Sequence, residues 1–402
     1  MTARHSRSLG MAQIAVALAG FCAFINLYSP QAVLPLLSQE FNASAAQVST
    51  IITVSTLAVA ITAPFTGAIA DVLGRKRVIV AAMFALVVPT LMVALSPSLN
   101  WLVFWRGVQG LVLPPVFAVT VAYIGDEWPP HGATKVTGIY SSASSVGGFS
   151  GRLLVGILAD LVSWRAGFIS LAAVAAIGAV LVAFLLPAER GFVGSKHIGA
   201  SLKQMLGHFK NGQLLATYAV GFGVLFNFIS TFTYISFYLA KPPYNLSPTA
   251  LGALFIVYLA GASLSPWTGW AVARFGRRRF VIRVLAVWAV GIALTLLSPL
   301  PVIILGLALC AACGLLCQAV STSYVAVTAK AGRSSAVGLY VTSFYIGGSC
   351  GSALGGIIWS YGEWPACVAM VIAMLTIMTL VVTFLWARRV PPGPQVPPLE
   401  AA

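Results

Sequence analysis

Residues 67–77 read GAIADVLGRKR, and residues 269–279 repeat the pattern as GWAVARFGRRR. Each stretch is a short basic turn between two long apolar runs. The shift between the copies, 269 − 67 = 202, is about half of the 402-residue chain. Because a fixed shift between similar segments indicates internal duplication, the sequence predicts two similar halves joined end to end.

A second and longer repeated segment supports the duplication. GIYSSASSVGGFSGRLLVG at 138–156 aligns with GLYVTSFYIGGSCGSALGG at 338–356. The residues that return after 200 positions are Gly138, Tyr140, Gly147, Gly148, Gly151, Gly156 and, farther on, Trp164. Glycines at such spacing let helix backbones approach closely in lipid. Two interpretations stay open for them: packing alone, or packing at a hinge that slides.

Composition excludes a water-soluble globule. The chain is 59% hydrophobic and 8% charged, against about 25% charged in an ordinary soluble domain. Apolar runs long enough to cross a hydrocarbon core of about 30 Å recur along the whole chain. We expect helices, because backbone polar groups in lipid must be satisfied within each span and barrel strands would alternate in polarity. The twelve expected spans are 11–35, 45–70, 78–96, 101–125, 134–160, 166–187, 213–240, 249–272, 280–298, 301–328, 335–360 and 364–387.

The predicted fold is an all-α membrane protein with twelve transmembrane helices in two six-helix bundles related by a pseudo-twofold axis. A substrate would bind at the seam between the bundles. We expect an N-terminal bundle over 1–187, a cytoplasmic linker over 188–212, a C-terminal bundle over 213–389 and a disordered, proline-rich tail over 390–402. An amphipathic linker helix on the membrane surface is predicted from Ile198, Leu202, Met205 and Phe209.

The basic residues indicate orientation rather than a nucleic-acid partner. The net charge is +15, and with both termini inside, nineteen of the 23 Lys and Arg lie in cytoplasmic segments and two in outer loops. The last two, Arg106 and Arg152, fall within spans. This is the positive-inside pattern. We expect a multi-pass protein with both termini cytoplasmic, no nucleic-acid partner, and an uncleaved first helix rather than a secretory signal.

The sequence predicts no metal, no cofactor and no catalytic residue. Cys310, Cys313 and Cys317 share a helical face that would allow a metal site, but no His or acid accompanies them. No G-x-x-x-x-G-K-[ST] phosphate loop is present either. Any energy for transport must therefore come from a gradient.

The first basic turn resembles the loop signature of the major facilitator superfamily, G-x-x-x-D-x-x-G-R-K, and the likeness extends over residues 11–387. The matching residues are Gly67, Asp71, Gly74, Arg75 and Lys76. The resemblance implies that this turn forms a charge cluster that latches one conformation, with Asp126 and Glu127 as expected partners. Alternatively, the cations only enforce topology. The second copy has Ala273 in place of the acid, so only the first half is expected to carry a complete latch.

Residues of the fourth span resemble the L-x-x-x-R-x-x-Q-G pattern of the proton-coupled efflux branch of this family. They are Leu102, Arg106, Gln109 and Gly110. The resemblance implies a role for Arg106 in proton coupling, and a buried Arg marks a functional position by default. Because Arg106 lies about five residues, or ~8 Å, inside the span end, snorkelling is the alternative.

The fifth span departs from the drug-antiporter pattern. It reads VGGFSGR, without the expected proline and with Arg152 in the helix. The chain more closely resembles the sugar or arabinose efflux permeases of bacterial inner membranes. Arg152 lies ~12 Å inside the span end, at a depth similar to Arg106. We therefore expect both cations to face one cavity.

The sequence places no acidic side chain deep inside any predicted span. The eight acids all lie near a membrane surface or in the tail, although proton coupling normally uses an intramembrane carboxylate. We hypothesise that Glu40 or Asp160 exchanges partnership with Arg106 or Arg152 as protons come and go.

Polar and aromatic residues on helical faces predict the substrate cavity, with the first, fourth, seventh and tenth helices placed around it by family analogy. The predicted cavity residues are Asn26, Tyr28, Gln31, Gln109, Asn227, Thr231, Tyr234, Gln318, Ser321 and Tyr324. Each one alone would equally serve as an ordinary helix-to-helix hydrogen bond, worth ~0.6 kcal/mol. Together they suit a small amphipathic solute, and the two arginines favour anionic or neutral solutes over cations.

The sequence thus predicts a monomeric inner-membrane secondary transporter in the lipid bilayer that exports a small amphipathic or sugar-like solute, with protons as the coupling ion. An organic-anion transporter is the alternative within transport. A receptor or assembly factor that keeps the fold without transport is the alternative from another class. An integral-membrane enzyme is the weakest interpretation, since no metal cluster or paired buried carboxylates lie in the spans.

Overall fold

The computed structural model describes residues 2–189, 207–264, 267–329 and 333–386, and every regular element in these ranges is a helix. The first half contains α1 (Thr2–Leu27), η1 (Ser29–Ala32), α2 (Leu34–Glu40), α3 (Ala45–Leu73), α4 (Arg75–Ala94), α5 (Leu99–Glu127), α6 (Pro130–Leu161) and α7 (Trp164–Leu185). The second half contains η2 (His208–Lys210), α9 (Gly212–Leu239), α10 (Pro248–Ala253), η3 (Leu254–Val257), α11 (Tyr258–Leu264), α12 (Thr268–Phe275), α13 (Arg277–Leu294), α14 (Leu300–Thr328) and α15 (Arg333–Leu385).

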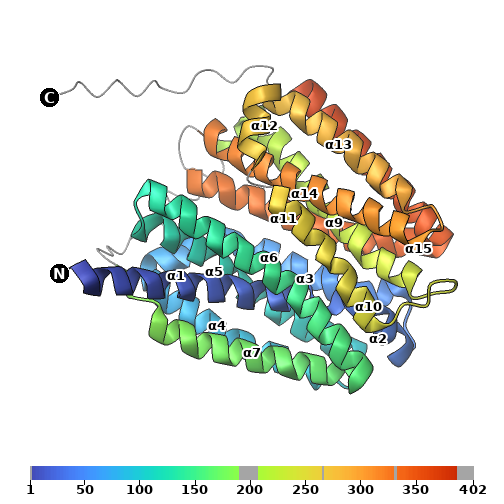
Figure 1. Cartoon of the computed structure of the whole chain (residues 1–402), viewed down its shortest axis with the longest axis horizontal. Coiled ribbons are helices and arrows are strands. Elements are labelled where there is room, and N and C mark those ends of the chain that lie inside the picture. Colours follow the sequence, from blue (N-terminus) through green and yellow to red (C-terminus); the bar gives the residue numbers. More distant parts are fainter. Residues whose placement is uncertain (1, 190–206, 265–266, 330–332, 387–402) are drawn as a thin grey trace.

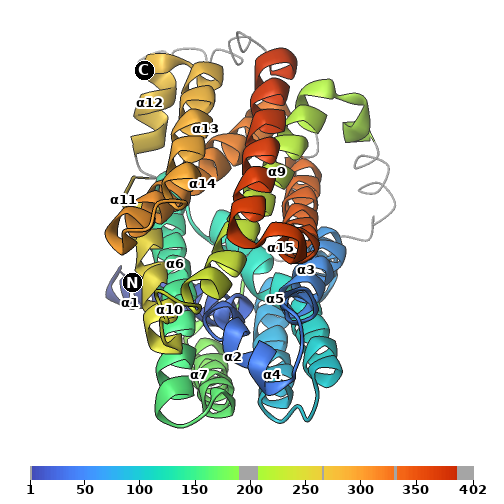
Figure 2. The same cartoon turned by 90° about the vertical axis from the view of Figure 1, so that its right-hand side faces the viewer.

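The two halves form two helical layers. Figure 1 shows α1–α7 as one blue-to-green layer and α9–α15 as a second layer that runs from yellow-green to red. Figure 2, turned by 90°, shows α7 and α13 far apart on the two sides of the molecule. The layers meet where α3 packs on α15 and where α6 packs on α10. The predicted all-α membrane fold with two six-helix bundles is confirmed.

Eight helices among the described residues are long and apolar enough to cross a membrane. One of them, α15, contains two of the predicted spans, because the helical path breaks at Gly362 and Glu363, where Glu363 has φ 48°. The remaining crossings are α6, α13 and the series α10–η3–α11–α12. The predicted span over 249–272 corresponds to α10, η3, α11 and α12, where the 3₁₀ stretch η3 interrupts the α-helical path; residues 265–266 of this crossing lie outside the described residues.

The first predicted span also needs a correction. The expected helix over 11–35 ends at Leu27, and the chain continues as η1 and α2, each with a proline in its first turn. Proline has no backbone N–H to continue an α-helical ladder. The helix therefore stops where Pro30 would have to donate to the carbonyl of Asn26.

The basic turns of both halves adopt the same unusual backbone. Gly74 between α3 and α4 has φ 90°, and Gly276 between α12 and α13 has φ 77°. Positive φ favours glycine, which lacks a Cβ. Their separation, 276 − 74 = 202, equals the shift found in the sequence. We call the end of the bundle with these two turns the basic end and the other end the opposite end.

The duplicated glycines make equivalent contacts in each half. A Cβ on Gly151 of α6 would overlap the carbonyl oxygen of Ile25 in α1, and a Cβ on Gly351 of α15 would overlap that of Phe226 in α9. The same symmetry holds across the seam: Gly156 rests on the backbone of Pro248, and Gly356 rests on Ala46. Ala46 and Pro248 are 248 − 46 = 202 residues apart, which is the shift between the two halves. The seam therefore contains the same glycine contact twice, once from each half.

These contacts predict a stability difference between glycines of the same helices. We expect Gly151→Ala and Gly351→Ala to lower the free energy of unfolding by about 1–3 kcal/mol, because the added methyl group forces two backbones apart. Gly138 and Gly338 are matched controls, since a Cβ there meets nothing within 4 Å, and alanine gains roughly 1 kcal/mol of helix propensity over glycine. Thermal unfolding in detergent measures both pairs. Equal melting temperatures for all four variants would contradict the packing argument.

Parts of the predicted linker and tail lie outside the described residues. The predicted amphipathic helix falls mainly on 190–206 and the tail on 390–402, so Ile198, Leu202 and Met205 are not described. Phe209, the last apolar position of that pattern, lies in η2 and is half exposed.

Candidate functional site

Arg106 of α5 lies against the broken end of α1. The carbonyl of Asn26 has no helical donor, because Pro30 stands four residues later, and the N–H of Gln31 donates to the carbonyl of Tyr28 at 3.1 Å instead of continuing the helix. The Arg106 guanidinium occupies this gap. Its Nη1 donates to the carbonyl of Asn26 at 3.1 Å and its Nη2 to that of Leu27 at 2.5 Å. A cation at a helix C-terminus also complements the helix dipole.

A polar network surrounds this guanidinium. Arg106 donates to the hydroxyl of Ser55 at 3.1 Å and to the side-chain oxygen of Gln109. The amide of Gln109 in turn donates to Thr90 at 2.8 Å and to Asn26 at 3.3 Å. All five side chains are buried. The structure therefore brings together Asn26, Arg106 and Gln109 as expected, and adds two hydroxyls that the sequence analysis missed. Thr90 had a visible signal, since it is a lone polar residue within an apolar span.

Arg152 of α6 forms a second buried centre. Its Nε and Nη2 both donate to the side-chain oxygen of Gln31, at 2.9 and 2.6 Å, and its Nη1 donates to the carbonyl of Gly148 at 2.6 Å. Gln31 then donates through Nε2 to the hydroxyl of Thr233 in α9, at 3.1 Å. Arg152 is thereby connected through one amide to the other half of the protein.

Aromatic rings enclose the Arg152 guanidinium. Its central carbon lies 4.2 Å from the ring centre of Phe255, 4.9 Å from that of Tyr258 and 5.2 Å from that of Tyr28. Phe255 and Tyr258 belong to the second half, at η3 and the start of α11. A desolvated cation over an aromatic face is worth about 2 kcal/mol. We call Arg152 and these three rings the arginine cage.

The ring of Tyr28 lies against the Arg152 guanidinium, and Tyr28 interacts electrostatically with both arginines. No salt bridge joins either arginine to a carboxylate among the described residues. Buried cations need partners, and here carbonyl, amide and hydroxyl oxygens and aromatic faces supply them. The snorkelling alternative for Arg106 is wrong, because its side chain is 0% exposed and directed at the interior of the bundle.

The two acids expected near the arginines lie elsewhere. Glu40 pairs with Arg165 at 2.9 Å, and both side chains are partly exposed. This hydrogen bond lowers the pKa of Glu40. Asp160 accepts a hydrogen bond at 2.9 Å from the backbone N–H of Thr249. In this structure neither acid is paired with Arg106 or Arg152, because each carboxylate meets a nearer donor at the opposite end. The predicted exchange of partners between these acids and the arginines stays a prediction.

Predicted cavity residues of the second half do not join the arginine network. The Tyr234 hydroxyl donates to the carbonyl of Ser352, and the Tyr324 hydroxyl donates to Gln213 at 2.9 Å. Asn227 donates to the sulfur of Met378 at 3.4 Å. Gln318 is half-buried in α14.

Three predicted cavity residues of this half have a buried oxygen without a hydrogen-bond partner among the described residues. They are Asn227 at Oδ1, Thr231 at Oγ1 and Ser321 at Oγ. An unmatched buried acceptor or hydroxyl costs about 1–3 kcal/mol, so a polar solute that reached these oxygens would relieve this cost.

The predicted latch residues cluster at the basic end. Arg75 at the start of α4 forms ion pairs with Asp126 of α5 and, at 3.4 Å, with Asp71 of α3. Glu189 was missed: its carboxylate accepts from the backbone N–H of Lys76 at 3.3 Å. Gly67 faces open space on α3, and Glu127 ends α5 next to Asp126.

Hydrogen bonds between the halves lie on the side of the opposite end. Among the described residues they include Gln31 to Thr233, Arg152 to Tyr258, Thr249 to Asp160, Ser349 to the carbonyl of Thr53 and Ser352 to the carbonyl of Ser49. Ser49 and Thr53 lie in the first turns of α3, which begins at the opposite end. The aromatic contact of Phe117 with Tyr345, at 6.0 Å between ring centres, lies deeper. The halves are thus closed together at the opposite end.

Comparison with known proteins identifies the architecture. A family model described as Major Facilitator Superfamily matches residues 16–257 and 222–402. The inner membrane transport protein YnfM of Escherichia coli (strain K12) is 32% identical over 374 residues, which are 92% of this chain and 89% of that protein. An uncharacterized transporter of Buchnera aphidicola subsp. Schizaphis graminum is 30% identical over 92% of this chain and 90% of its own length. The crystal structure of a mutant of the nucleoside transporter NupG has a TM-score of 0.77 at 14% identity and covers 94% of this chain and 100% of that one.

Proposed function

Because this chain belongs to the major facilitator superfamily and is a membrane transporter of that type, we propose that it is a secondary transporter that exports a small amphipathic or sugar-like solute by alternating access, driven by protons. The observation that supports this proposal best is the closed seam at the opposite end. There the arginine cage and the two glycines Gly156 and Gly356 bring the halves into contact. A seam made of a few polar links and close glycine contacts is suited to opening without disrupting either bundle.

We place the basic end in the cytoplasm of a bacterial inner membrane, with the protein acting as a monomer. The excess of Lys and Arg at this end supports this orientation. A solute then reaches the central residues from the cytoplasm while the arginine cage seals the outer side. The two buried guanidiniums and the unmatched oxygens of Asn227, Thr231 and Ser321 supply polar partners within the bundle.

Asp160 is the strongest candidate for the proton-bearing group. Its carboxylate accepts a hydrogen bond from Thr249 across the seam, so protonation weakens a link between the halves. Glu40 is less suitable, because Arg165 lowers its pKa and both residues belong to the same half.

This assignment makes a prediction for pH-driven transport. We expect Asp160→Asn to remove most of the stimulation of transport by a pH step, because the amide cannot exchange a proton. Glu40→Gln is the matched control and should keep the stimulation. The measurement is solute accumulation in inverted membrane vesicles with and without the step. If a pH step stimulates transport by the Asp160→Asn protein as strongly as by the parent protein, Asp160 does not carry the coupled proton.

One observation favours an organic anion as the solute. Arg106 and Arg152 are both buried without a carboxylate partner among the described residues, so an anionic solute would offset uncompensated positive charge. Inverted vesicles offered a labelled neutral sugar and a labelled aromatic carboxylate distinguish the two solute classes. Accumulation of neither, with intact folded protein, would favour the receptor alternative.

A further inference from the structure

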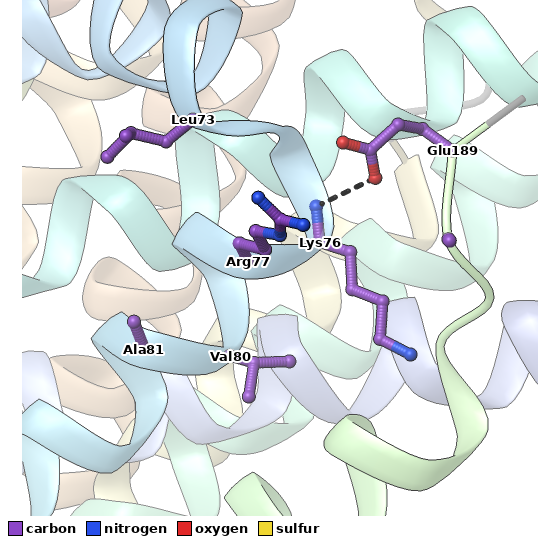
Figure 3. A pocket seen from close by; sticks show the side chains of 7 residues that line it. Leu73, Lys76, Arg77, Val80, Ala81 and Glu189 are labelled. Carbon is purple, nitrogen blue, oxygen red and sulfur yellow. Dashed lines mark hydrogen bonds between the residues drawn. The ribbon is translucent and has the colours of Figure 1, made fainter. Parts of the chain in front are cut away.

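A cavity of about 620 Å³ lies at the start of α4, away from the arginine network. Its walls include Leu73 of α3, the first turns of α4 at Lys76, Arg77, Val80 and Ala81, and Glu189 after α7. Figure 3 shows Glu189 across from Lys76 and Arg77, with a dashed line from its carboxylate to the Lys76 backbone nitrogen. We call this cavity the basic-turn pocket.

The basic-turn pocket has one carboxylate and two cationic side chains. The Glu189 carboxylate is directed at the N-terminus of α4, where it accepts from Lys76 N, and a helix N-terminus itself offsets negative charge. Neither the Lys76 ammonium nor the Arg77 guanidinium has an ion-pair partner among the described residues. Two cations thus remain to attract an anionic group.

The rest of the pocket is apolar and continues toward the lipid. Arg77, Ala81, Phe84 and Val88 are all exposed, at intervals of four, three and four residues. Residues so spaced share one face of a helix. Phe84 and Val88 are 45% and 55% exposed, and α7, which packs on α4, presents Phe184 with 83% exposed. A cationic site therefore stands at the head of an exposed apolar stripe.

We propose that the basic-turn pocket binds a phospholipid with an anionic headgroup. The phosphate would lie between Lys76 and Arg77, and an acyl chain would lie along Ala81, Phe84 and Val88. Clustered cations beside a membrane helix attract anionic lipids, and the apolar stripe selects a lipid over a soluble phosphate. Arg75, the next residue in the turn, holds Asp71 and Asp126, so an occupied pocket bears directly on the ion pairs of the latch.

The pseudo-symmetry of the chain provides a matched control. Arg278 and Arg279 occupy the corresponding turn after Gly276 and carry the same charge as Lys76 and Arg77. In the part of the chain that the structure describes, no ion pair joins either arginine to a carboxylate, and the basic-turn pocket does not reach this turn. The control therefore separates a built site from a general basic surface.

The test is native mass spectrometry of the full-length protein with phosphatidylglycerol and phosphatidylcholine of identical acyl chains. We expect phosphatidylglycerol to be preferred. Lys76→Gln with Arg77→Gln should weaken its binding about thirtyfold, from about 1 kcal/mol for each cation and tenfold for each 1.4 kcal/mol. Arg278→Gln with Arg279→Gln should bind like the parent protein. Glu189→Gln should bind phosphatidylglycerol more tightly, which tests the site even where the first double variant folds poorly.

Three results would overturn the proposal. Equal losses in both double variants would show a general basic surface. Displacement of phosphatidylglycerol by inorganic phosphate would show a site for free phosphate. Unchanged or weaker binding of phosphatidylglycerol by the Glu189→Gln protein would show that the lipid does not bind next to this carboxylate, and therefore not in the basic-turn pocket.

Discussion

Replacement of Arg106 by alanine is expected to lower the stability of the protein strongly and to abolish transport. The change removes the printed donor to the buried carbonyl of Leu27 and to Gln109 Oε1, and it leaves the carbonyl of Asn26 with only the hydroxyl of Ser29. Each buried acceptor left unpaired costs about 1–3 kcal/mol. Relief from burying a charge offsets part of this loss, so the net change in the free energy of unfolding should be about 2–4 kcal/mol.

Two further variants make the test specific. Arg106→Lys keeps the charge but lacks the planar fork that reaches both carbonyls, so it should remain less stable than the parent. Arg165→Ala is the matched control, because Arg165 is an exposed arginine in a surface ion pair, and such pairs contribute about 0–1 kcal/mol. Thermal unfolding in detergent and uptake by inverted vesicles measure the two effects. Normal stability of the Arg106→Ala protein would refute its role at the end of α1.

The second large effect is expected from the arginine cage. We expect Arg152→Ala to open the seam at the opposite end, because it removes the contacts with Phe255 and Tyr258 and releases Gln31 from its bidentate bond. Desolvated cation–π contacts are worth about 2 kcal/mol. A loss of this size shifts a two-state equilibrium roughly thirtyfold toward the open arrangement.

Distances between spin labels at the opposite end measure this shift. Val162 in the first half and Leu297 in the second are exposed there and accept labels after the six native cysteines are replaced. The Arg152→Ala protein should show a longer distance than the parent. Lys241→Ala is the control, because Lys241 also contacts an aromatic ring and a carboxylate, Trp359 and Glu363, but both lie in its own half. Identical distance distributions in all three proteins would contradict a gating role for the cage.

The duplication could be predicted from the sequence, because it includes turns whose backbone conformation requires particular residue types. The 202-residue shift between the basic turns returns as two glycines with positive φ, Gly74 and Gly276. The repeated glycines return as equivalent close contacts of α6 and α15. Such positions constrain the residue type directly, so pattern and structure agree.

The arginine site was only half predictable. The grouping of Arg106 with Gln109 follows from helical spacing within one span, and the family resemblance implied that Asn26 of the first helix would lie beside them. Phe255 and Tyr258 were not predicted, because they meet Arg152 where the 3₁₀ stretch η3 interrupts the α-helical path, and the periodicity argument assumes an uninterrupted α-helix. In this conformation Glu40 and Asp160 are not paired with either arginine, because surface turns offer nearer donors, Arg165 and the Thr249 backbone; their exchange of partners stays a prediction.

The interruption of the crossing between α10 and α12 also bears on how the protein is made. Its apolar helix Pro248–Gly261, formed by the short pieces α10, η3 and part of α11, has no more than 17 residues, whereas an isolated segment needs about 20 apolar residues to be stable across a bilayer. The pieces depend instead on α6, which is synthesised earlier, and on α14, which is synthesised later. During biosynthesis this segment should therefore stay near the insertion machinery until α14 has emerged, and a ribosome stalled before that point should leave it open to proteolysis.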